Sequence, residues 1–333
     1  MSTILDLWSI GDAEEVTVVR AYGEGGHPEL HLEGLMPILQ LLDPQKYPRR
    51  VLVLGSPSAG SPTPGFTPAL ICNSICDPDS NREGLEAAER VIGAYPGVRV
   101  VNPPGAVRNS SRERLASLAV GIAGLRVPKT VRIAPLSSAE LPEWVEKYGM
   151  EFPVLFRPVG GQEGRALIRI DSAEESGKLE AYALDGREFY LSEFVDFRSS
   201  DGYYRKYRFF IIAGKILPGH VIYSKHWKIQ RDTIAELPPA LKREAVDFLS
   251  FSEEEGVASL GVLAEKIGLD FMGVDCSFLA DGKILLFEAN ACMNPFSEEK
   301  EPGYYTEAWR KRIVTALESL MDAKISTVKS VKR

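Results

Sequence analysis

The segment GLDFMGVDCSFLADGKILLFEANACMNPF, residues 268–296, decides the fold of this chain of 333 residues. It contains two apolar stretches separated by a turn at Asp281-Gly282, which predicts a β-hairpin. Asp275 lies on the first predicted strand. Glu288 and Asn290, two positions apart, project from one face of the second. The hairpin therefore brings three oxygen-bearing side chains together.

Two carboxylates and an amide at a strand end suit a hard divalent cation such as Mg²⁺, which takes oxygen ligands and keeps some waters. The alternative is that Asp275 and Glu288 are solvated residues on an edge hairpin. The flanks GVD and LLFEAN place each carboxylate beside apolar residues, and a desolvated acid needs a partner. The spacing alone leaves both interpretations open.

A second pattern lies at FPVLFRP, residues 152–158, where a predicted strand carrying Arg157 runs into the loop GGQEG at 160–164. The backbone amides of such a loop can close over phosphates while a guanidinium binds their oxygens. Most glycine loops are simple hairpin turns, so this pattern too has two interpretations.

A third pattern is YLSEFVD, residues 190–196, where Glu193 stands between apolar neighbours. A strand with free backbone amides and a carboxylate could recognise an adenine edge. An ordinary amphipathic strand is the alternative.

The fourth pattern is YYRKYRFF, in which Lys206 and Arg208 share one face of a predicted strand. The region after the next strand adds His226 and Lys228. A solvated basic face, a surface for single-stranded nucleic acid and an enclosed phosphate site are the alternatives. The acidic balance of the chain and the nearby carboxylates favour the phosphate site.

Composition narrows the function classes. Acidic residues number 46 against 39 Lys plus Arg, a net charge of −7, which disfavours nucleic acid and anionic lipid as partners. Hydrophobic residues make up 44%, as in soluble globular proteins. No apolar run reaches the roughly 18 residues of a membrane span, and the N-terminus lacks the pattern of a signal peptide. We therefore expect a cytoplasmic protein with no membrane partner.

The four cysteines form no CxxC pair and are too few for a disulfide framework, so reduced thiols are expected. Cys72 and Cys76 stand four residues apart, as do His27 and His31. Either pair could bind a metal, but buried thiols and surface imidazoles are the simpler interpretation.

The order of elements predicts two kinds of architecture. Residues 51–55 and 69–75 read as buried strands, 79–95 as a helix and 98–102 as a strand, which indicates an α/β domain with a largely parallel sheet. A helix over 111–124 follows. From residue 152 onward, strands with hairpin turns dominate, interrupted by helices within 237–267 and closed by a helix near 306–321. The fold class is therefore α/β and α+β.

In this order the motifs resemble the ATP-grasp superfamily of carboxylate-amine ligases, in its D-alanine ligase-like and ribosomal-protein glutamate-ligase-like branches. The resemblance covers most of the chain: CNSICDPD, VVNPPGAVRNSSRERLASL and GLRVPKT for the leading domain and linker, PVLFRPVGGQEGRA for the phosphate loop, LSEFV for the nucleotide hinge, and 268–296 for the metal hairpin. It implies a leading α/β domain (1–112), a central subdomain (113–192) and a C-terminal subdomain (193–333), with the nucleotide between the last two.

The resemblance also implies the roles of individual residues. It implies three Mg²⁺ ligands, for which Mn²⁺ can substitute: Asp275, Glu288 and Asn290. It implies an ATP site at Arg114, Arg157, Gly160, Gly161, Gly164, Glu193, Phe194, Val195, Lys206 and Phe287, with Arg112 as the alternative to Arg114. Three cations are expected at the transferring phosphoryl group: Arg208, Arg157 and Lys228.

The chain departs from the family pattern at two positions. Arg157 stands where the family usually has lysine, which exchanges a point charge for a planar fork. An arginine of the D-alanine branch is absent, because Gly273 occupies its place, and Arg208 is expected to supply that charge instead. The acceptor pocket is expected between the leading domain and the loop containing Cys292, Met293 and Asn294, with Cys292 as a small pocket wall.

The expected function is an ATP-dependent ligase that joins a carboxylate to an amine through an acylphosphate and releases ADP and phosphate. Amino acids or a peptide are the expected kind of substrate, and association into a homodimer is left open. A small-molecule kinase on the same scaffold and a non-catalytic nucleotide-binding module are the alternatives.

Overall fold

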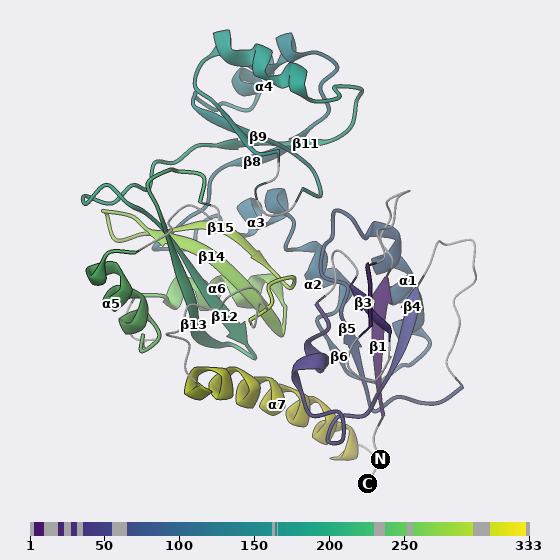
Figure 1. Ribbon diagram of the computed structural model, residues 1–333. Coiled ribbons are helices and arrows are strands. Elements are labelled where there is room, and N and C mark those ends of the chain that lie inside the picture. The colour runs from purple at the N-terminus through teal and green to yellow at the C-terminus, as the bar shows by residue number, and fades with distance from the viewer. Residues whose placement is uncertain are drawn as a thin grey trace.

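The computed structural model describes residues 3–9, 19–22, 28–31, 36–54, 65–161, 164, 166–229, 237–251, 256–295 and 307–330. Three β-sheets, each with its own helices, divide these residues into a leading domain, a central subdomain and a C-terminal subdomain (Figure 1). A separate two-stranded ladder joins β2 (Val19–Tyr22) and β3 (Pro28–His31).

The leading domain has a parallel sheet, as predicted. Its strand order is β4-β1-β5-β6, formed by β4 (Arg49–Leu54), β1 (Ile4–Ser9), β5 (Leu70–Asn73) and β6 (Val100–Val101). The helix α1 (Arg82–Gly93) connects β5 to β6 and buries Leu85, Ala88 and Val91 on one side. The short helix α2 (Pro104–Arg108) follows β6.

The central subdomain is an antiparallel sheet with its own core. Its order is β10-β9-β11-β8, formed by β10 (Ile168–Ile170), β9 (Val154–Pro158), β11 (Phe189–Glu193) and β8 (Thr130–Ile133). The helix α4 (Leu141–Lys147) and the 3₁₀ segment Ala173–Ala181 cover one face (Figure 1). Phe156 and Phe189 stack at the centre of this core, with ring centroids 4.5 Å apart.

The C-terminal subdomain carries the predicted hairpin. Its order is β13-β12-β14-β15-β7, formed by β13 (Lys215–Ser224), β12 (Tyr204–Ile212), β14 (Phe271–Phe278), β15 (Ile284–Asn290) and β7 (Leu125–Arg126). Ala213 and Gly214 both have positive φ, 50° and 81°, as the tight turn between β12 and β13 requires. The helices are α3 (Arg112–Leu118), α5 (Pro239–Phe248), α6 (Ala258–Ile267) and α7 (Glu307–Ser330).

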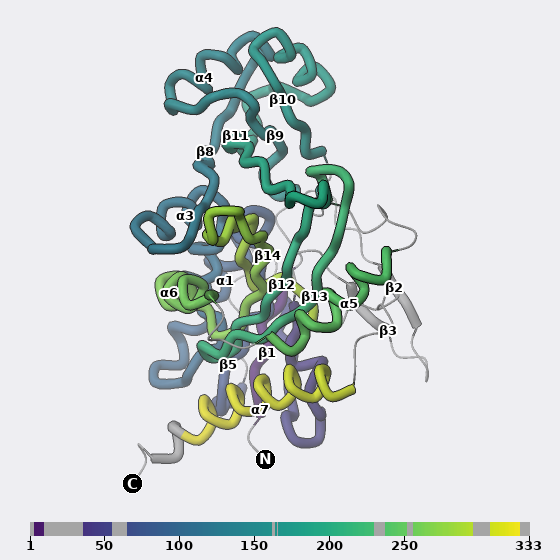
Figure 2. The backbone as a smooth tube through the Cα atoms, turned by 90° about the vertical axis from the view of Figure 1, so that its left-hand side faces the viewer, coloured from purple at the N-terminus to yellow at the C-terminus, as the bar shows by residue number. Residues whose placement is uncertain are grey.

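The leading domain and the C-terminal subdomain share one continuous apolar core, whereas the central core is separate. The helix α7 crosses the lower part of the molecule, beside both of them (Figure 2). Tyr47 of the leading domain donates a hydrogen bond from its hydroxyl to Asp322 of α7 at 2.8 Å. Lys324 of the same helix bonds to the Val100 carbonyl in the leading domain and to Asp270, which immediately precedes β14.

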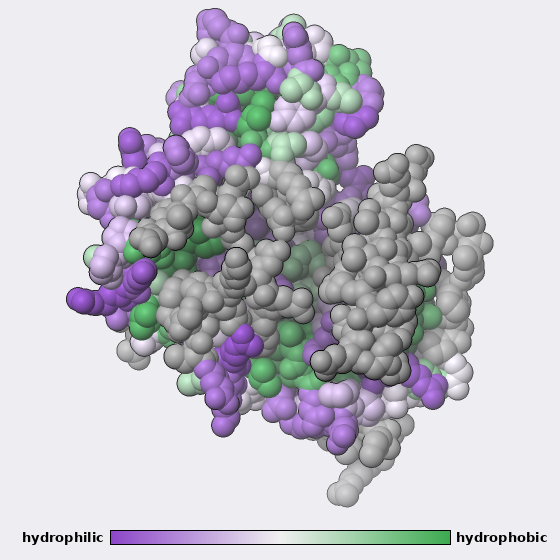
Figure 3. Space-filling view, in the orientation of Figure 1, coloured by the Kyte–Doolittle hydropathy of each residue, from purple (hydrophilic) through white to green (hydrophobic). Residues whose placement is uncertain are grey.

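The surface of the described residues has scattered apolar side chains. The large hydrophobic residues exposed there are Val51 and Val53 on β4, Val246 on α5, Val262 on α6, and Val120 and Leu136 between elements. On the face seen in Figure 3, hydrophilic residues cover much of the central subdomain. None of the helices within the described ranges has the length and hydropathy that a membrane crossing requires.

Two sequence-based expectations about the elements need correction. Residues 51–55 were expected to form a buried strand, but β4 lies at the edge of its sheet, and Val51 and Val53 are 42% and 45% exposed. The helix expected over 111–124 is shorter, because α3 ends at Leu118. In addition, β1, one of the two inner strands of the leading sheet, was not predicted from the sequence patterns. The domain boundaries near 112 and 192 stay a prediction; β7 lies beyond the first of them and pairs with β15.

Candidate active site

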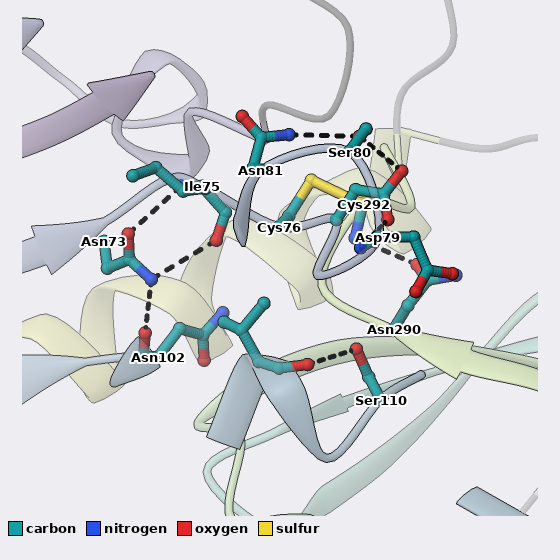
Figure 4. The surroundings of a disulfide bond; sticks show 12 residues. Asn73, Ile75, Cys76, Asp79, Ser80, Asn81, Asn102, Ser110, Asn290 and Cys292 are labelled. Atoms are coloured by element: carbon teal, nitrogen blue, oxygen red, sulfur yellow. Dashed lines mark hydrogen bonds between the residues drawn. A yellow bond between two sulfur atoms is a disulfide. The ribbon is translucent and has the colours of Figure 1, made fainter. Parts of the chain in front are cut away.

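A pocket forms where all three parts of the chain meet. The leading domain contributes the loop between β5 and α1, the connection from α2 to α3 contributes a second wall, the central subdomain contributes the start of the glycine loop, and the C-terminal subdomain contributes the end of β15. The lining residues are Cys76, Asp77, Pro78, Asp79, Ser110, Ser111, Arg112, Gly160, Gly161, Tyr190, Glu288, Asn290 and Cys292. Figure 4 shows part of this arrangement around Cys76 and Cys292.

The predicted hairpin supplies two of these lining side chains. In the register of β14 and β15, Asp275 stands opposite Glu288 and Gly273 stands opposite Asn290. The register shifts between Asp275 and Cys276, so Phe287 is an extra residue on β15. Glu288 and Asn290 line the pocket, as the two-residue spacing predicted.

The third side chain, Asp275, is held by two cations. It is 1% exposed and pairs with both Nε and Nη2 of Arg208, at 2.7 and 2.8 Å. Lys206 Nζ lies 3.2 Å from its Oδ2. Burial alone would raise the pKa of Asp275, but the charges of Arg208 and Lys206 outweigh burial and hold this pKa well below its usual range. The carboxylate is therefore ionised, and Arg208 and Lys206 lie behind it.

Glu288 is paired with Arg112, at the beginning of α3. Arg112 Nη2 lies 2.5 Å from Glu288 Oε2, and its Nη1 donates to the Phe287 carbonyl at 3.0 Å. Arg114, the residue first expected as the upstream cation, is exposed, and the structure does not bring it to the pocket. The structure thus favours the alternative, Arg112, and a role for Arg114 at the nucleotide stays a prediction. Arg114, two positions further along α3, lies about 200° round the helix from Arg112.

Arg157 lies at the predicted phosphate loop. It is 8% exposed, and its guanidinium donates to the Gly161 carbonyl. Burial, helped by the nearby charge of Arg112, lowers its pKa to about 10. Arg157 Nε is buried without a hydrogen-bond partner among the described residues, so one donor remains for a ligand. Gln162, Glu163 and Arg165 lie outside the described residues.

The predicted nucleotide hinge joins the central and C-terminal subdomains. Glu193 accepts a hydrogen bond from the Lys129 amide at 3.0 Å. The ring of Phe194 lies under Arg169, whose guanidinium carbon is 4.1 Å from the ring centroid, and against Trp227. Val195 is buried. The hinge therefore has an aromatic and cationic flank.

Phe287 and Lys228 flank the same region from the C-terminal subdomain. Phe287 contacts Phe197, with ring centroids 4.8 Å apart. Lys228 Nζ donates to the Leu167 carbonyl at 3.1 Å, and its Cε would lie 3.6 Å from a Cβ at Gly164. The structure thus places Lys228 against the glycine loop, whereas His226 is exposed.

An ion cluster missed by the sequence reasoning connects the leading domain to the central sheet. Arg132 on β8 contacts Asp79 and Glu113 at 2.8 Å each, and the Tyr190 hydroxyl at 2.9 Å. Tyr190 donates to Asp79 at 2.7 Å and stands opposite both Arg132 and Arg157 in the sheet register. Burial raises the pKa of Asp79. No sequence motif marks this cluster, because its members meet only through strand pairing and domain contact.

The expectation of reduced thiols is wrong for two of the four cysteines. Cys76 and Cys292 form a disulfide, with a Cα–Cα separation of 5.1 Å (Figure 4). Cys72 and Cys276 are buried and unpaired. The 216-residue separation hid the pair, since only folding brings the two residues together. The alternative of a metal site at Cys72 and Cys76 is excluded by this bond; His27 lies outside the described residues.

Packing explains why position 273 is a glycine. A Cβ at this position would lie 2.4 Å from both Cβ and Sδ of Met293. The Met293 side chain therefore occupies the place into which any larger residue at 273 would project, and the cations on this side of the hairpin come from β12 instead.

Two of the three expected donors fit a hard divalent cation, because Glu288 and Asn290 present oxygen atoms to the pocket. Asp275 stands directly across from Glu288, but it is buried, does not line the pocket, and has both carboxylate oxygens paired with Arg208. The described residues contain no metal-type cluster of three or more His, Cys, Asp or Glu, so the candidate centre depends on the amide of Asn290 as its third donor.

Comparison with known proteins confirms the predicted fold. No protein-family model matches the chain. This chain is 25% identical over 202 residues to the tetrahydromethanopterin:alpha-L-glutamate ligase of Methanococcus maripaludis. The match covers 59% of this chain and 62% of that relative. The chain thus spans less than two thirds of the length of the relative.

Solved structures resemble nearly the whole chain. The D-alanine–D-alanine ligase of Bacillus anthracis superposes with a TM-score of 0.58 at 12% identity over 99% of both chains, and its complex with ATP gives 0.52 at 13% identity over the same coverage. A RimK domain ATP-grasp protein of Sphaerobacter thermophilus gives 0.50 at 13% identity over 96% of this chain and 98% of that one. The chain has the ATP-grasp fold.

Proposed function

We propose that this chain is an ATP-dependent ligase that joins a carboxylate to an amine through an acylphosphate and releases ADP and phosphate. The observation that supports it most strongly is the pocket where Glu288 and Asn290 face Arg112 and the glycine loop after Arg157. Such a pocket combines oxygen donors for a cation with fixed positive charge for phosphates. The names of the similar proteins, ligases that act on D-alanine or glutamate, agree with it.

The proposed substrates are ATP, a small carboxylic acid of amino-acid type and an amine. Adenine would lie at the hinge of Glu193, Phe194 and Val195, with Phe287 beneath it, and the phosphates would extend toward Arg157. The acid would enter beside the leading-domain wall. We further propose that Mg²⁺ is held by Glu288, Asn290 and Asp275, with Mn²⁺ as a substitute; a bound Mg²⁺ would neutralise phosphate charge.

The chain's own residues would act mainly by positioning and charge. Arg157 has a buried donor left for a phosphate oxygen, and Lys228 lies against the glycine loop. Arg208 and Lys206 keep Asp275 ionised. The substrate carboxylate would attack the γ-phosphorus, ADP would leave, and the amine would then displace phosphate from the acyl carbon, losing one proton. Homodimer formation and a cytoplasmic location stay predictions.

Binding of Mg-ATP should stabilise the protein. A ligand that binds only the folded state adds about 2.7 kcal/mol at 100 times its dissociation constant, so the melting temperature should rise with nucleotide concentration. Differential scanning fluorimetry with ATP, ADP and GTP, each with Mg²⁺, measures this. Melting temperatures unchanged at millimolar ATP and ADP would contradict the nucleotide site.

Isotope transfer tests the acylphosphate directly. With the substrate carboxylate labelled with ¹⁸O, we expect one labelled oxygen in the released phosphate, because the carboxylate oxygen remains on phosphorus when the amine attacks carbon. Label in AMP would indicate adenylation instead. Formation of ADP with a stable phosphate ester and no need for an amine would indicate the kinase, and binding without turnover would indicate the non-catalytic module.

A further inference from the structure

The Cys76–Cys292 disulfide connects two supports of the candidate active site. Cys76 lies in the loop after β5, which Asn73 holds by accepting from the Ile75 amide and donating to the Ile75 and Asn102 carbonyls (Figure 4). Asn102 in turn accepts from the backbone amide of Phe271, at the start of β14. One end of the disulfide is therefore connected, through Asn73 and Asn102, to the start of β14.

The other end holds the turn that follows the candidate metal hairpin. The Cys292 amide donates to Asn290 Oδ1 at 2.9 Å, so the position of Cys292 determines the orientation of the Asn290 side chain. Asn290 lines the pocket beside Glu288. Met293, the next residue of the same turn, packs against Gly273. The disulfide thus fixes the side-chain amide of Asn290 through one backbone hydrogen bond.

The two cysteines differ in exposure. Cys76 is 1% exposed, whereas Cys292 is partly exposed, and both residues line the pocket. We therefore expect a small reductant to approach the disulfide from the pocket, on the side of Cys292. Cys72 and Cys276, the remaining cysteines, are each 0% exposed and stay out of reach.

We propose that the Cys76–Cys292 disulfide positions residues of the active site. A dithiol that reduces this disulfide reversibly lowers kcat/KM for the acid substrate. This rests on the proposed function. The oxidised form holds Asn290 and the leading-domain wall in place. The reduced form releases the turn at residues 291–293 and leaves the nucleotide hinge, in another part of the chain, unchanged.

The redox step is ordinary thiol–disulfide exchange. One thiolate of the dithiol attacks Cys292 Sγ, the S–S bond breaks, and Cys76 leaves as a thiolate. The second thiol then attacks the mixed disulfide and releases Cys292. Two electrons pass from the dithiol to the protein, the dithiol becomes a cyclic disulfide, and its two protons end on Cys76 and Cys292.

Thiol labelling of the full chain tests whether the Cys76–Cys292 disulfide exists and whether a reductant reaches it in the folded protein. With N-ethylmaleimide under native conditions, we expect no label before dithiothreitol and two labels after it, at Cys76 and Cys292. In denaturant without reductant, two of the four cysteines should react. Four labels there would mean that no disulfide forms, and the proposal would fail.

Hydrogen–deuterium exchange tests positioning without any assay of activity. Reduction should speed exchange in the peptide covering residues 289–294 at least tenfold, because the Cys292 amide loses its fixed acceptor, while residues 191–195 exchange as before. Equal exchange of 289–294 in both redox states would overturn the proposal even if the enzyme proved inactive. An inactive enzyme with redox-dependent exchange would instead contradict only the proposed function.

Kinetics then separate positioning from general loss of structure. Groups that orient a site typically contribute tenfold to hundredfold, so reduction should lower kcat/KM for the acid by roughly that factor, with the KM for ATP changed less than threefold. Reoxidation should restore the original value. The Cys76→Ser/Cys292→Ser double variant should have the kcat/KM of the reduced enzyme, and dithiothreitol should not change it. In the Cys72→Ala control, dithiothreitol should lower kcat/KM as it does in the parent. Equal kinetics in both redox states of an active enzyme would contradict the proposal.

Discussion

The Glu288→Gln variant is expected to fold normally and to turn over at least about 100-fold more slowly than the parent. Glutamine keeps the size of the side chain and can still accept the hydrogen bond that Arg112 donates. What it removes is the negative charge at the pocket, and charge stabilisation around a bound metal contributes several kcal/mol to phosphoryl-transfer sites. Steady-state release of ADP measures the loss.

Stability should change little in this variant, because the Arg112–Glu288 pair is about a quarter exposed, 24% and 26%, and such pairs contribute modestly. Glu244→Gln is the matched control. Glu244 also pairs with an arginine, Arg205, in the same subdomain, but it does not line the pocket, so turnover should stay near the parent value. A fully active Glu288→Gln enzyme would mean that the hairpin is not the metal site.

Arg157→Met should combine a large loss of activity with unchanged or higher stability. The guanidinium is buried, and its lowered pKa, about 10, shows that the folded state disfavours the charged form. That cost is present in full at pH values below about 10 and decreases only gradually as pH rises from there toward the ordinary pKa of arginine. Methionine removes the buried charge, and such replacements are often neutral or stabilising. Removal of a preorganised donor typically costs 100-fold to 1,000-fold in turnover.

The melting temperature and the rate of ADP release at pH 7.5 measure both effects. Arg157→Lys should recover much of the activity, since it restores a cation at the phosphate loop. Arg187→Met, at an exposed ion pair on the same subdomain, should leave activity unchanged. Loss of stability in Arg157→Met without loss of turnover would show that Arg157 is a structural residue.

The sequence predicted the antiparallel parts of the molecule better than the leading domain, for physical reasons. Alternation and a glycine turn mark the hairpin of β14 and β15, and both features act locally. In contrast, β1 has only six residues and carries the polar Asp6, which is 0% exposed at the centre of the leading sheet. Burial raises the pKa of Asp6 to about 6, and the Ser74 hydroxyl donates to its Oδ1. A buried acid of this kind breaks the apolar pattern that identifies a strand.

Long-range contacts explain the remaining differences at the candidate site. The hairpin residues Glu288 and Asn290 could be predicted because two-residue spacing on a strand fixes the face on which they lie. Arg112 could not be preferred over Arg114, because the rotation of α3 depends on its packing against β8 and α6. The disulfide and the Arg132 cluster required the docking of separate parts of the chain, which no local pattern records.

The shared core of the leading domain and the C-terminal subdomain makes them, mechanically, one body. The helix α7 ties them together on one side, and the Cys76–Cys292 bond ties them at the pocket. The central subdomain has its own core, so rotation of this part against that body is one way in which the pocket can widen. Such a rotation would have to break the contacts of Arg132 with Asp79 and of Arg82 with Glu188, which hold the central subdomain to the leading domain.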